Sequence, residues 1–229
     1  MTTGLYTLHR TRIKLCGLST PDAIAQAVDL GADAIGLVFY PPSARSVGLA
    51  QAAELARRVP PFVSIVGLFV NATPQWLDEV TRNVPLTLLQ FHGDETPQQC
   101  ASLAERARLP WLRALRVATD TRAADLIEWA RRYASASALL LDAQADGYGG
   151  GGQVFDWSVI PAGFAQRAVL SGGLNAQNVG DAIARVRPYA VDVSSGIEVP
   201  GRKGVKDPAR MAAFVRAVRD ADCESQCQW

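Results

Sequence analysis

The sequence predicts a single α/β domain that folds as a closed (β/α)8 barrel, the TIM-barrel class with a parallel eight-stranded sheet. Short aliphatic or β-branched runs alternate with alanine-rich segments of helical spacing, a pattern typical of parallel strands joined by helices. Eight such units follow one another, and eight is the number that closes this barrel. The chain has 229 residues, a length at which such barrels form one domain.

The predicted strands are apolar runs that end in polar residues or glycine. They cover residues 12–16, 34–39, 62–70, 86–91, 111–117, 138–142, 167–171 and 190–194. The predicted helices cover 21–30, 49–59, 74–83, 97–107, 121–133, a weak segment near 157–162, 176–186 and 208–220. The barrel core is expected over 11–220, within a single domain 1–229, and residues 222–229 are expected to fray. An open doubly wound sheet would need a nucleotide-binding fingerprint after the first strand, and "CGLSTPDA" is not one.

Helix boundaries carry their own signals. N-cap residues stand directly before proline at Ser19/Thr20, Thr73, Thr96 and Asp207, which predicts helices that begin at the prolines. Gly31 in "DLGAD" is typical of a helix end followed by a new strand.

Composition narrows the possible partners and compartment. Net charge is +1, which favours neither nucleic acid nor an anionic membrane as a partner. The longest apolar runs, such as 62–70, are too short to span a bilayer, and the N-terminus has no apolar signal core. Four scattered cysteines do not form a disulfide framework, so we expect a cytoplasmic protein. The sequence does not decide between a monomer and a homodimer.

The first strand, "RIKLC" at residues 12–16, alternates polar and apolar residues. Successive strand residues alternate between the barrel interior and the helix layer. Ile13 and Leu15 belong against the helices, so Arg12, Lys14 and Cys16 are expected to point into the barrel. Cys16 then stands at the carboxyl end of its strand, where barrel enzymes build their sites.

Two later strands repeat this arrangement. By the same alternation, Asp142 in "LLLD" and Asp192 and Ser194 in "VDVSS" point inward near the ends of their strands. An unpaired charge inside the barrel would cost several kcal/mol, as an order of magnitude, so these groups need partners. We therefore expect Lys14 on the first strand to lie close to Asp192 on the adjacent eighth strand.

The turns after strands seven and eight are candidates for binding phosphate. Gly172 and Gly173 follow strand seven and allow the backbone to approach an anion closely. Ser194, Ser195 and Gly196 follow strand eight and offer amide and hydroxyl donors. A Gly-Gly turn alone is a common structural feature, but this pair of turns occupies the usual phosphate site of the fold.

A set of motifs in register resembles one enzyme family. The motifs are "RIKLCG", "GLVFYPPSARSV", "VGLFVN", "LLQFHGDE", "LLLDA", "GGGQVFDW", "VLSGGLN", "VDVSSGIE" and "GVKD", in this order. They resemble phosphoribosylanthranilate isomerase, over essentially residues 11–220. The resemblance implies an isomerase of tryptophan biosynthesis that catalyses an Amadori rearrangement. In this reaction N-(5-phosphoribosyl)anthranilate becomes 1-(2-carboxyphenylamino)-1-deoxyribulose 5-phosphate, with an acid, a base and no cofactor or metal.

The same resemblance implies the catalytic pair. Cys16 is the general base and Asp142 the general acid. A free thiol has a pKa of about 8.5, and Lys14 on the same face is expected to lower it, while Gly17 removes bulk beside the sulfur. Asp142 must have a raised pKa to act as an acid. The alternatives are a cysteine that only packs and a carboxylate that only caps a loop.

Further residues are expected to hold the substrate. Arg45 resembles the ligand of the anthranilate carboxylate, for which a guanidinium offers two parallel hydrogen bonds. Gln90 and His92 are expected to line the site, although a lone histidine is more often structural. Asp192 could also bond a sugar hydroxyl. The family often has a cation in the strand-six loop, where this chain has Gln153 within a glycine-rich segment.

Three functional hypotheses remain at this stage. The first is the isomerase. The second is another phosphosugar barrel enzyme, such as indole-glycerol-phosphate synthase or a tryptophan synthase of the α type. These need other constellations of residues, and the indole-glycerol-phosphate synthase would need catalytic lysines at strand ends. The third is a non-catalytic barrel that binds a phosphometabolite.

Cys223 and Cys227 lack a nearby histidine and form an incomplete metal-ligand set, and Cys100 is expected to pack in the core.

Overall fold

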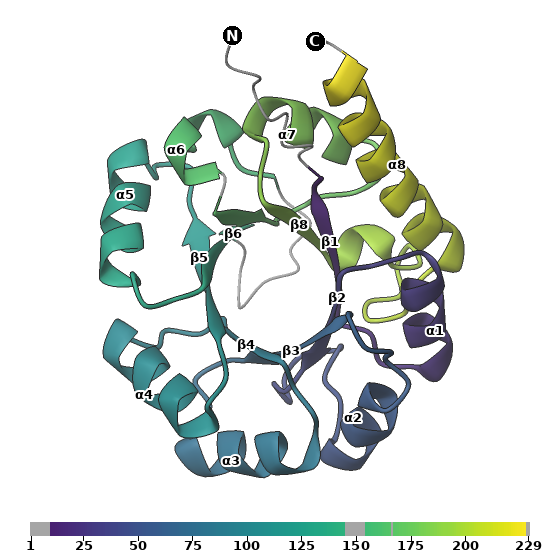
Figure 1. The fold of residues 1–229 in the computed structure, drawn as a ribbon, viewed down its shortest axis with the longest axis vertical. Coiled ribbons are helices and arrows are strands. Elements are labelled where there is room, and N and C mark those ends of the chain that lie inside the picture. The colour runs from purple at the N-terminus through teal and green to yellow at the C-terminus, as the bar shows by residue number, and fades with distance from the viewer. Residues whose placement is uncertain (1–9, 145–153, 166, 228–229) are drawn as a thin grey trace, which may run out of the picture.

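The protein folds as a closed barrel of eight parallel strands, which confirms the predicted fold class. The computed structural model describes residues 10–144, 154–165 and 167–227. Each strand pairs with its neighbours in sequence, and β1 pairs with β8 to close the sheet. Figure 1 looks along the barrel and shows the helices as an outer ring around the strands.

The strands match the predicted runs closely. They are β1 (Arg12–Cys16), β2 (Ala34–Val38), β3 (Ser64–Phe69), β4 (Leu88–Phe91), β5 (Trp111–Val117), β6 (Ala138–Ala143), β7 (Ala168–Leu170) and β8 (Ala190–Val193). β3 begins two residues later than predicted because Phe62 has a φ of 73°, a left-handed conformation that a strand cannot contain.

The helices follow the strands in alternation. They are α1 (Pro21–Asp29), α2 (Leu49–Ala56), α3 (Pro74–Asn83), α4 (Pro97–Ala107), α5 (Ala123–Arg132), η1 (Trp157–Val159), α6 (Ala162–Ala165), α7 (Val179–Val186), η2 (Ser195–Ile197) and α8 (Pro208–Cys227). The predicted caps are confirmed: Thr20, Thr73 and Thr96 each accept a hydrogen bond from the first turn of their helix, and Asp207 accepts from two amides of α8.

Several helix boundaries differ from the predictions; α2, for example, ends at Ala56 rather than at residue 59. α7 begins at Val179 rather than 176 because Asn175 and Asn178 bond nearby backbone amides and hold a turn there. The weak segment near 157–162 divides into η1 and α6, with Pro161 between them. α8 continues to Cys227, beyond the predicted end at residue 220.

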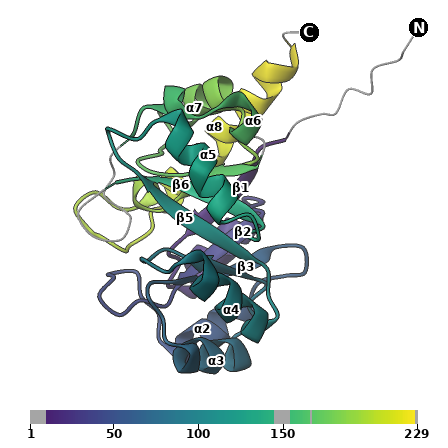
Figure 2. The ribbon, with the colours of Figure 1, turned by 90° about the vertical axis from the view of Figure 1, so that its left-hand side faces the viewer.

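Apolar side chains pack on both sides of the strands. One large cluster between strands and helices contains Ile13 and Leu15, as the alternation predicts. Two small clusters fill the barrel interior; one contains Cys16 and the other Leu140. Figure 2 shows the barrel from the side, with the segment between β8 and α8 projecting at the left edge. Of the helices in the described residues, none is both long and apolar enough to cross a bilayer.

Candidate active site

Cys16 is the last residue of β1 and points into the barrel, where its thiol is free and only 4% exposed. The space beside the sulfur comes from Gly36 on β2, the register partner of Cys16. A Cβ at Gly36 would lie 2.6 Å from Cys16 Sγ, closer than atoms can approach. Gly17, expected to provide this space, instead adopts a φ of +74° and lies against Arg45, whose Cδ would be 2.7 Å from an added Cβ.

Lys14 and Asp192 form the ion pair that the strand faces predict. Lys14 Nζ donates to Asp192 Oδ1 at 2.6 Å, and both side chains are buried. Asp192 Oδ2 accepts a second hydrogen bond from Ser171 Oγ at 3.1 Å. Burial by itself lowers the pKa of Lys14, but the negative charges of Asp192 and Cys16 outweigh it and raise this pKa. Lys14 therefore remains an ammonium group two residues before the thiol.

The pKa of Cys16 is raised, whereas the sequence led us to expect Lys14 to lower it. Burial is the largest cause and disfavours the thiolate. Lys14 does lower the pKa of Cys16, and so does Lys206, but Asp192 raises it and burial prevails. The expected effect of Lys14 is therefore present, but burial sets the net direction, and the depth at which the sulfur is buried cannot be read from the alternation of the strand.

Asp142 lies on the interior side of β6, buried next to His92. His92 Nε2 is 3.2 Å from Asp142 Oδ2, and on its other side His92 Nδ1 is 3.1 Å from Gln90 Nε2. Gln90 lies on β4 and His92 directly follows it, so the contact of His92 with Asp142 links β4 to β6 across the barrel interior. The predicted residues Gln90, His92 and Asp142 thus form one polar chain.

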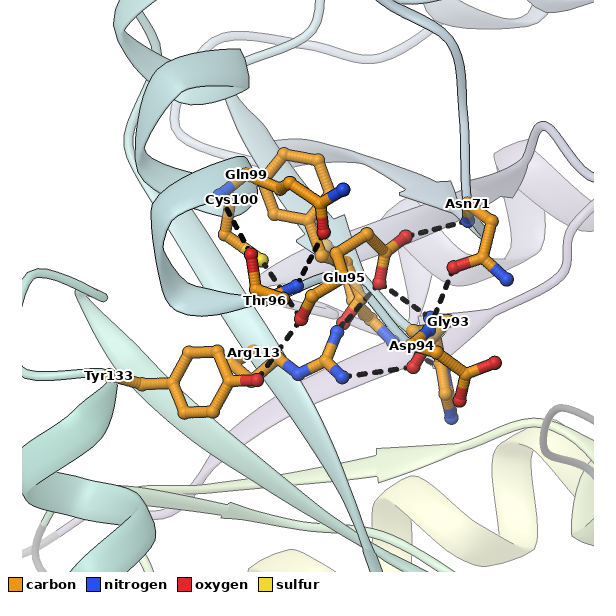
Figure 3. A network of polar contacts seen from close by, with 12 residues as sticks. Asn71, Gly93, Asp94, Glu95, Thr96, Gln99, Cys100, Arg113 and Tyr133 are labelled. Carbon is orange, nitrogen blue, oxygen red and sulfur yellow. Dashed lines mark hydrogen bonds and ion pairs between the residues drawn. The ribbon is translucent and has the colours of Figure 1, made fainter.

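A buried network that the sequence analysis missed holds the loop after His92, and Figure 3 shows it. Glu95 accepts hydrogen bonds from the amides of Asn71 at 2.7 Å and Gly93 at 2.9 Å. Arg113 Nη1 pairs with Glu95 Oε2 at 2.7 Å, and Arg113 Nη2 donates to the Gly93 carbonyl at 2.9 Å. The Tyr133 hydroxyl donates to the Glu95 carbonyl at 3.0 Å. The network fixes the backbone that follows His92.

Arg45 lies in the loop after β2 and is 7% exposed. Its guanidinium holds Glu198 in a two-point ion pair, with Nε to Oε1 at 2.6 Å and Nη2 to Oε2 at 3.0 Å. Lys206 Nζ also reaches Glu198 Oε1, at 3.1 Å. Burial alone would raise the pKa of Glu198, but Arg45 and Lys206 together bring it below its ordinary value. Sequence reasoning named neither Glu198 nor Lys206 as a site residue.

The two candidate phosphate turns pack directly against one another. Gly172 and Gly173 have φ values of 82° and 64°, and a Cβ at Gly172 would lie 2.3 Å from the Ala143 amide at the end of β6. Gly196 in η2 leaves no room for a Cβ, which would lie 2.0 Å from the Leu174 carbonyl oxygen. Both turns follow the carboxyl ends of their strands, and the Gly172 turn lies beside β6, the strand that carries Asp142.

Ser194 connects the turn after β8 to Cys16. Its hydroxyl donates to the Cys16 carbonyl at 3.1 Å and accepts from Lys206 Nζ at 3.3 Å. We expected this hydroxyl to donate to a ligand, but it is bonded within the protein. The backbone amides of Ser194 and Ser195 remain as candidate donors to a phosphate. Gln153 and the glycine-rich segment 147–152 lie outside the described residues.

Two further cysteines are described by the structure. Cys100 is buried in the core on α4, as expected, and Cys223 is exposed on α8. In the described part of the chain, no group of three or more histidine, cysteine or carboxylate side chains is arranged to hold a metal ion.

Comparison with known proteins gives a consistent result. The family described as N-(5'phosphoribosyl)anthranilate (PRA) isomerase matches residues 13–217. An N-(5'-phosphoribosyl)anthranilate isomerase of Ralstonia nicotianae is 64% identical over 224 residues, covering 94% of this chain and 95% of the relative. The crystal structure of phosphoribosyl anthranilate isomerase from Thermotoga maritima is 38% identical with a TM-score of 0.81, covering 92% and 99% of the two chains.

A further solved structure contains a ligand. It is a phosphoribosyl anthranilate isomerase in complex with reduced 1-(o-carboxyphenylamino)-1-deoxyribulose 5-phosphate. It is 34% identical to this chain with a TM-score of 0.75, covering 92% of this chain and 99% of the other.

Proposed function

Because the chain belongs to the N-(5'-phosphoribosyl)anthranilate isomerase family, we propose that Cys16 and Asp142 carry out its acid–base chemistry. The enzyme is an isomerase of tryptophan biosynthesis. It rearranges N-(5-phosphoribosyl)anthranilate, an aminoaldose, into 1-(2-carboxyphenylamino)-1-deoxyribulose 5-phosphate, a ketose. The observation that supports our assignment is that both side chains are buried inside the barrel at the carboxyl ends of their strands.

Asp142 acts first, as the general acid. It gives a proton to the ring oxygen of the sugar, the bond from C1 to that oxygen breaks, and the nitrogen lone pair forms a protonated Schiff base. His92 Nε2 lies 3.2 Å from the carboxyl group and Gln90 contacts the other ring nitrogen, so we assign these two residues to orienting the acid. The neighbouring Gly172 turn brings the sugar phosphate to the same side of the barrel.

Cys16 then acts as the general base. Its thiolate takes the proton from C2, the C2–H electrons form the C1–C2 double bond, and the Schiff-base nitrogen becomes neutral. The resulting enolamine tautomerises to the ketone. Burial disfavours the thiolate, while Lys14 and Lys206 favour it, and the positive charge of the Schiff base adds to their effect.

Binding groups surround this pair. We assign the phosphate to the amides of the turns at Gly172–Gly173 and Ser194–Gly196, a sugar hydroxyl to Asp192, and the anthranilate carboxylate to Arg45. The closed packing of the two turns supports the first assignment. For Arg45, the support is a buried guanidinium that stands next to Gly17 and so next to Cys16.

We further propose a cytoplasmic enzyme that acts as a monomer or a homodimer. The proposal on compartment is supported by the free thiol of Cys16, because oxidation would remove the base.

The test is a direct assay with enzymatically generated phosphoribosylanthranilate, following the loss of anthranilate fluorescence. Cys16→Ser and Asp142→Asn are each expected to lose most of kcat, by about 100-fold or more. Arg45→Ala is expected mainly to raise KM. Near-normal kcat in both catalytic variants, with chemistry shown to be rate-limiting, would refute the assigned roles. A protein that binds the product analogue but turns nothing over would support a non-catalytic barrel instead.

A further inference from the structure

Two family motifs contribute residues that the reaction scheme leaves unused. Glu198 ends "VDVSSGIE" and Lys206 stands in "GVKD". The segment between η2 and α8 folds back on itself, so the two residues face each other in an isolated antiparallel bridge. The Val199 amide donates to the Val205 carbonyl at 2.8 Å and closes this turn. The fold therefore places a buried carboxylate and a buried ammonium group side by side at the active-site end of the barrel.

Glu198 holds only one side of the Arg45 guanidinium. The two hydrogen bonds use Nε and one hydrogen of Nη2. A guanidinium has five N–H donors, so three remain, two on Nη1 and one on Nη2. One hydrogen of Nη1 and the free hydrogen of Nη2 form a second fork on the adjacent edge, and this fork suits another carboxylate. Arg45 can therefore bind Glu198 and a substrate carboxylate at the same time.

Lys206 is used entirely within the protein. Its ammonium group donates to Glu198 Oε1 at 3.1 Å, to the Ser194 carbonyl at 2.9 Å and to Ser194 Oγ at 3.3 Å. Three acceptor oxygens match the three ammonium hydrogens, and the side chain is only 3% exposed. Lys206 thus joins Glu198 to Ser194, which is itself bonded to the Cys16 carbonyl.

We propose that Glu198 is a positioning residue, which fixes the plane and edge of Arg45 for the substrate carboxylate, and that Lys206 holds Glu198 in place. The proposal rests on the role assigned to Arg45 above. The formal charges of Arg45, Lys206 and Glu198 sum to +1, so one substrate carboxylate makes the cluster neutral. The opposite arrangement, in which Glu198 occupies the place of that carboxylate, would require the substrate to break a buried two-point ion pair.

Glu198→Gln separates these possibilities, because glutamine preserves the shape and removes the charge. We expect KM to rise about tenfold, which corresponds to about 1.4 kcal/mol, with kcat changed less than about threefold. Binding of the reduced product analogue should weaken by a similar factor. A lower KM would show that Glu198 competes with the substrate, and an unchanged KM would show that Glu198 only stabilises the fold. Either result overturns the proposal.

Inhibition by inorganic phosphate distinguishes a positioning role of Glu198 from a general distortion of the site. It lacks the anthranilate carboxylate, so its inhibition constant should stay within about twofold in Glu198→Gln. A parallel rise in that constant and in KM would indicate general distortion of the site and overturn the proposal. Asp222→Asn is the matched control, since it alters another buried carboxylate, bonded to Thr11 ahead of β1. It is expected to lower Tm and leave KM unchanged.

A double variant tests whether Glu198 acts through Arg45. In the Arg45→Ala background, Glu198→Gln should add less than about twofold to KM, because coupled residues are not additive. Fully additive effects would contradict the proposal. If Arg45→Ala leaves KM unchanged, the assignment of Arg45 itself fails, which is a separate result. If Glu198→Gln does not fold, Glu198→Asp keeps the charge, shortens the reach to Arg45, and should also raise KM.

Discussion

Lys14 Nζ lies 2.6 Å from Asp192 Oδ1, inside the barrel at the seam where β1 meets β8. The two residues are also register partners on the paired strands, so the contact spans the closure of the sheet. Ser171, the residue that follows β7, donates a hydrogen bond to the other oxygen of the Asp192 carboxylate. One buried carboxylate thus connects three consecutive segments of the barrel wall beneath the reacting thiol.

Removal of this carboxylate charge should destabilise the fold strongly. Asp192→Asn leaves the Lys14 ammonium group buried without its counterion, and we expect a loss of about 3–5 kcal/mol in the free energy of unfolding. Urea denaturation measures it. The control is Asp181→Asn, which breaks the exposed pair with Arg185 on α7 and should cost about 0.3–0.5 kcal/mol. Similar losses in the two variants would contradict the view that burial makes the difference.

The raised pKa of Cys16 predicts the direction of the pH profile. The base must be a thiolate, and burial favours the thiol, so kcat/KM should increase as the pH rises and should continue to increase above about 8.5, the ordinary thiol value. Lys206→Met removes a charge that lowers the pKa of Cys16, so the rising limb should move to higher pH. Lys203→Met, at an exposed position, should leave it in place. A profile that is flat from pH 7 to 10 would argue against Cys16 as the base.

A methyl group at Gly36 should displace the catalytic sulfur. Its carbon would lie 2.6 Å from Cys16 Sγ and 3.1 Å from the Cys16 Cα, so the strand end has to shift. Gly36→Ala is therefore expected to lower kcat about tenfold or more, since small misplacements of a reacting group are costly. Gly163→Ala on α6 meets nothing within 4 Å and should leave kcat unchanged. Equal activity of the two variants would show that the sulfur has room to move.

The Glu95 network should protect particular amides from hydrogen exchange. Glu95→Gln weakens the acceptor for the amides of Asn71 and Gly93, and their exchange should accelerate about tenfold, equivalent to about 1.4 kcal/mol of local opening. Amide-resolved hydrogen–deuterium exchange measures this. Glu105→Gln, an exposed position on α4, should change neither amide. Unchanged protection in Glu95→Gln would mean that Arg113 alone holds the loop.

The strand periodicity predicts the fold and the interior position of Cys16, Asp142 and Asp192 because alternation depends only on neighbouring residues. The Lys14–Asp192 pair is also predictable, since adjacent strands each place a charge inside. Gly36 could have been found, because a glycine inside a strand often marks a close approach. Arg113 could have been found too: it occupies an outward position in "WLRALRV", where a charge under the helix layer requires a partner.

Glu198 and Lys206 could not have been placed in this way. The ion pair of Glu198 with Arg45 joins positions 153 residues apart, and that of Glu198 with Lys206 depends on a turn between η2 and α8. The net direction of the Cys16 pKa is equally hidden, since it results from burial against several opposing charges.

The Asp222 carboxylate on α8 accepts hydrogen bonds from both the amide and the hydroxyl of Thr11, the residue before β1. The two residues are 211 positions apart in sequence. During synthesis, the segment that carries Cys16 therefore leaves the ribosome long before the helix that secures it. The first strand can pair with β2 early, but its contacts with β8 and α8 form only after nearly the whole polypeptide has been translated. We infer that nascent chains truncated before α8 contain every catalytic side chain and yet lack a working enzyme.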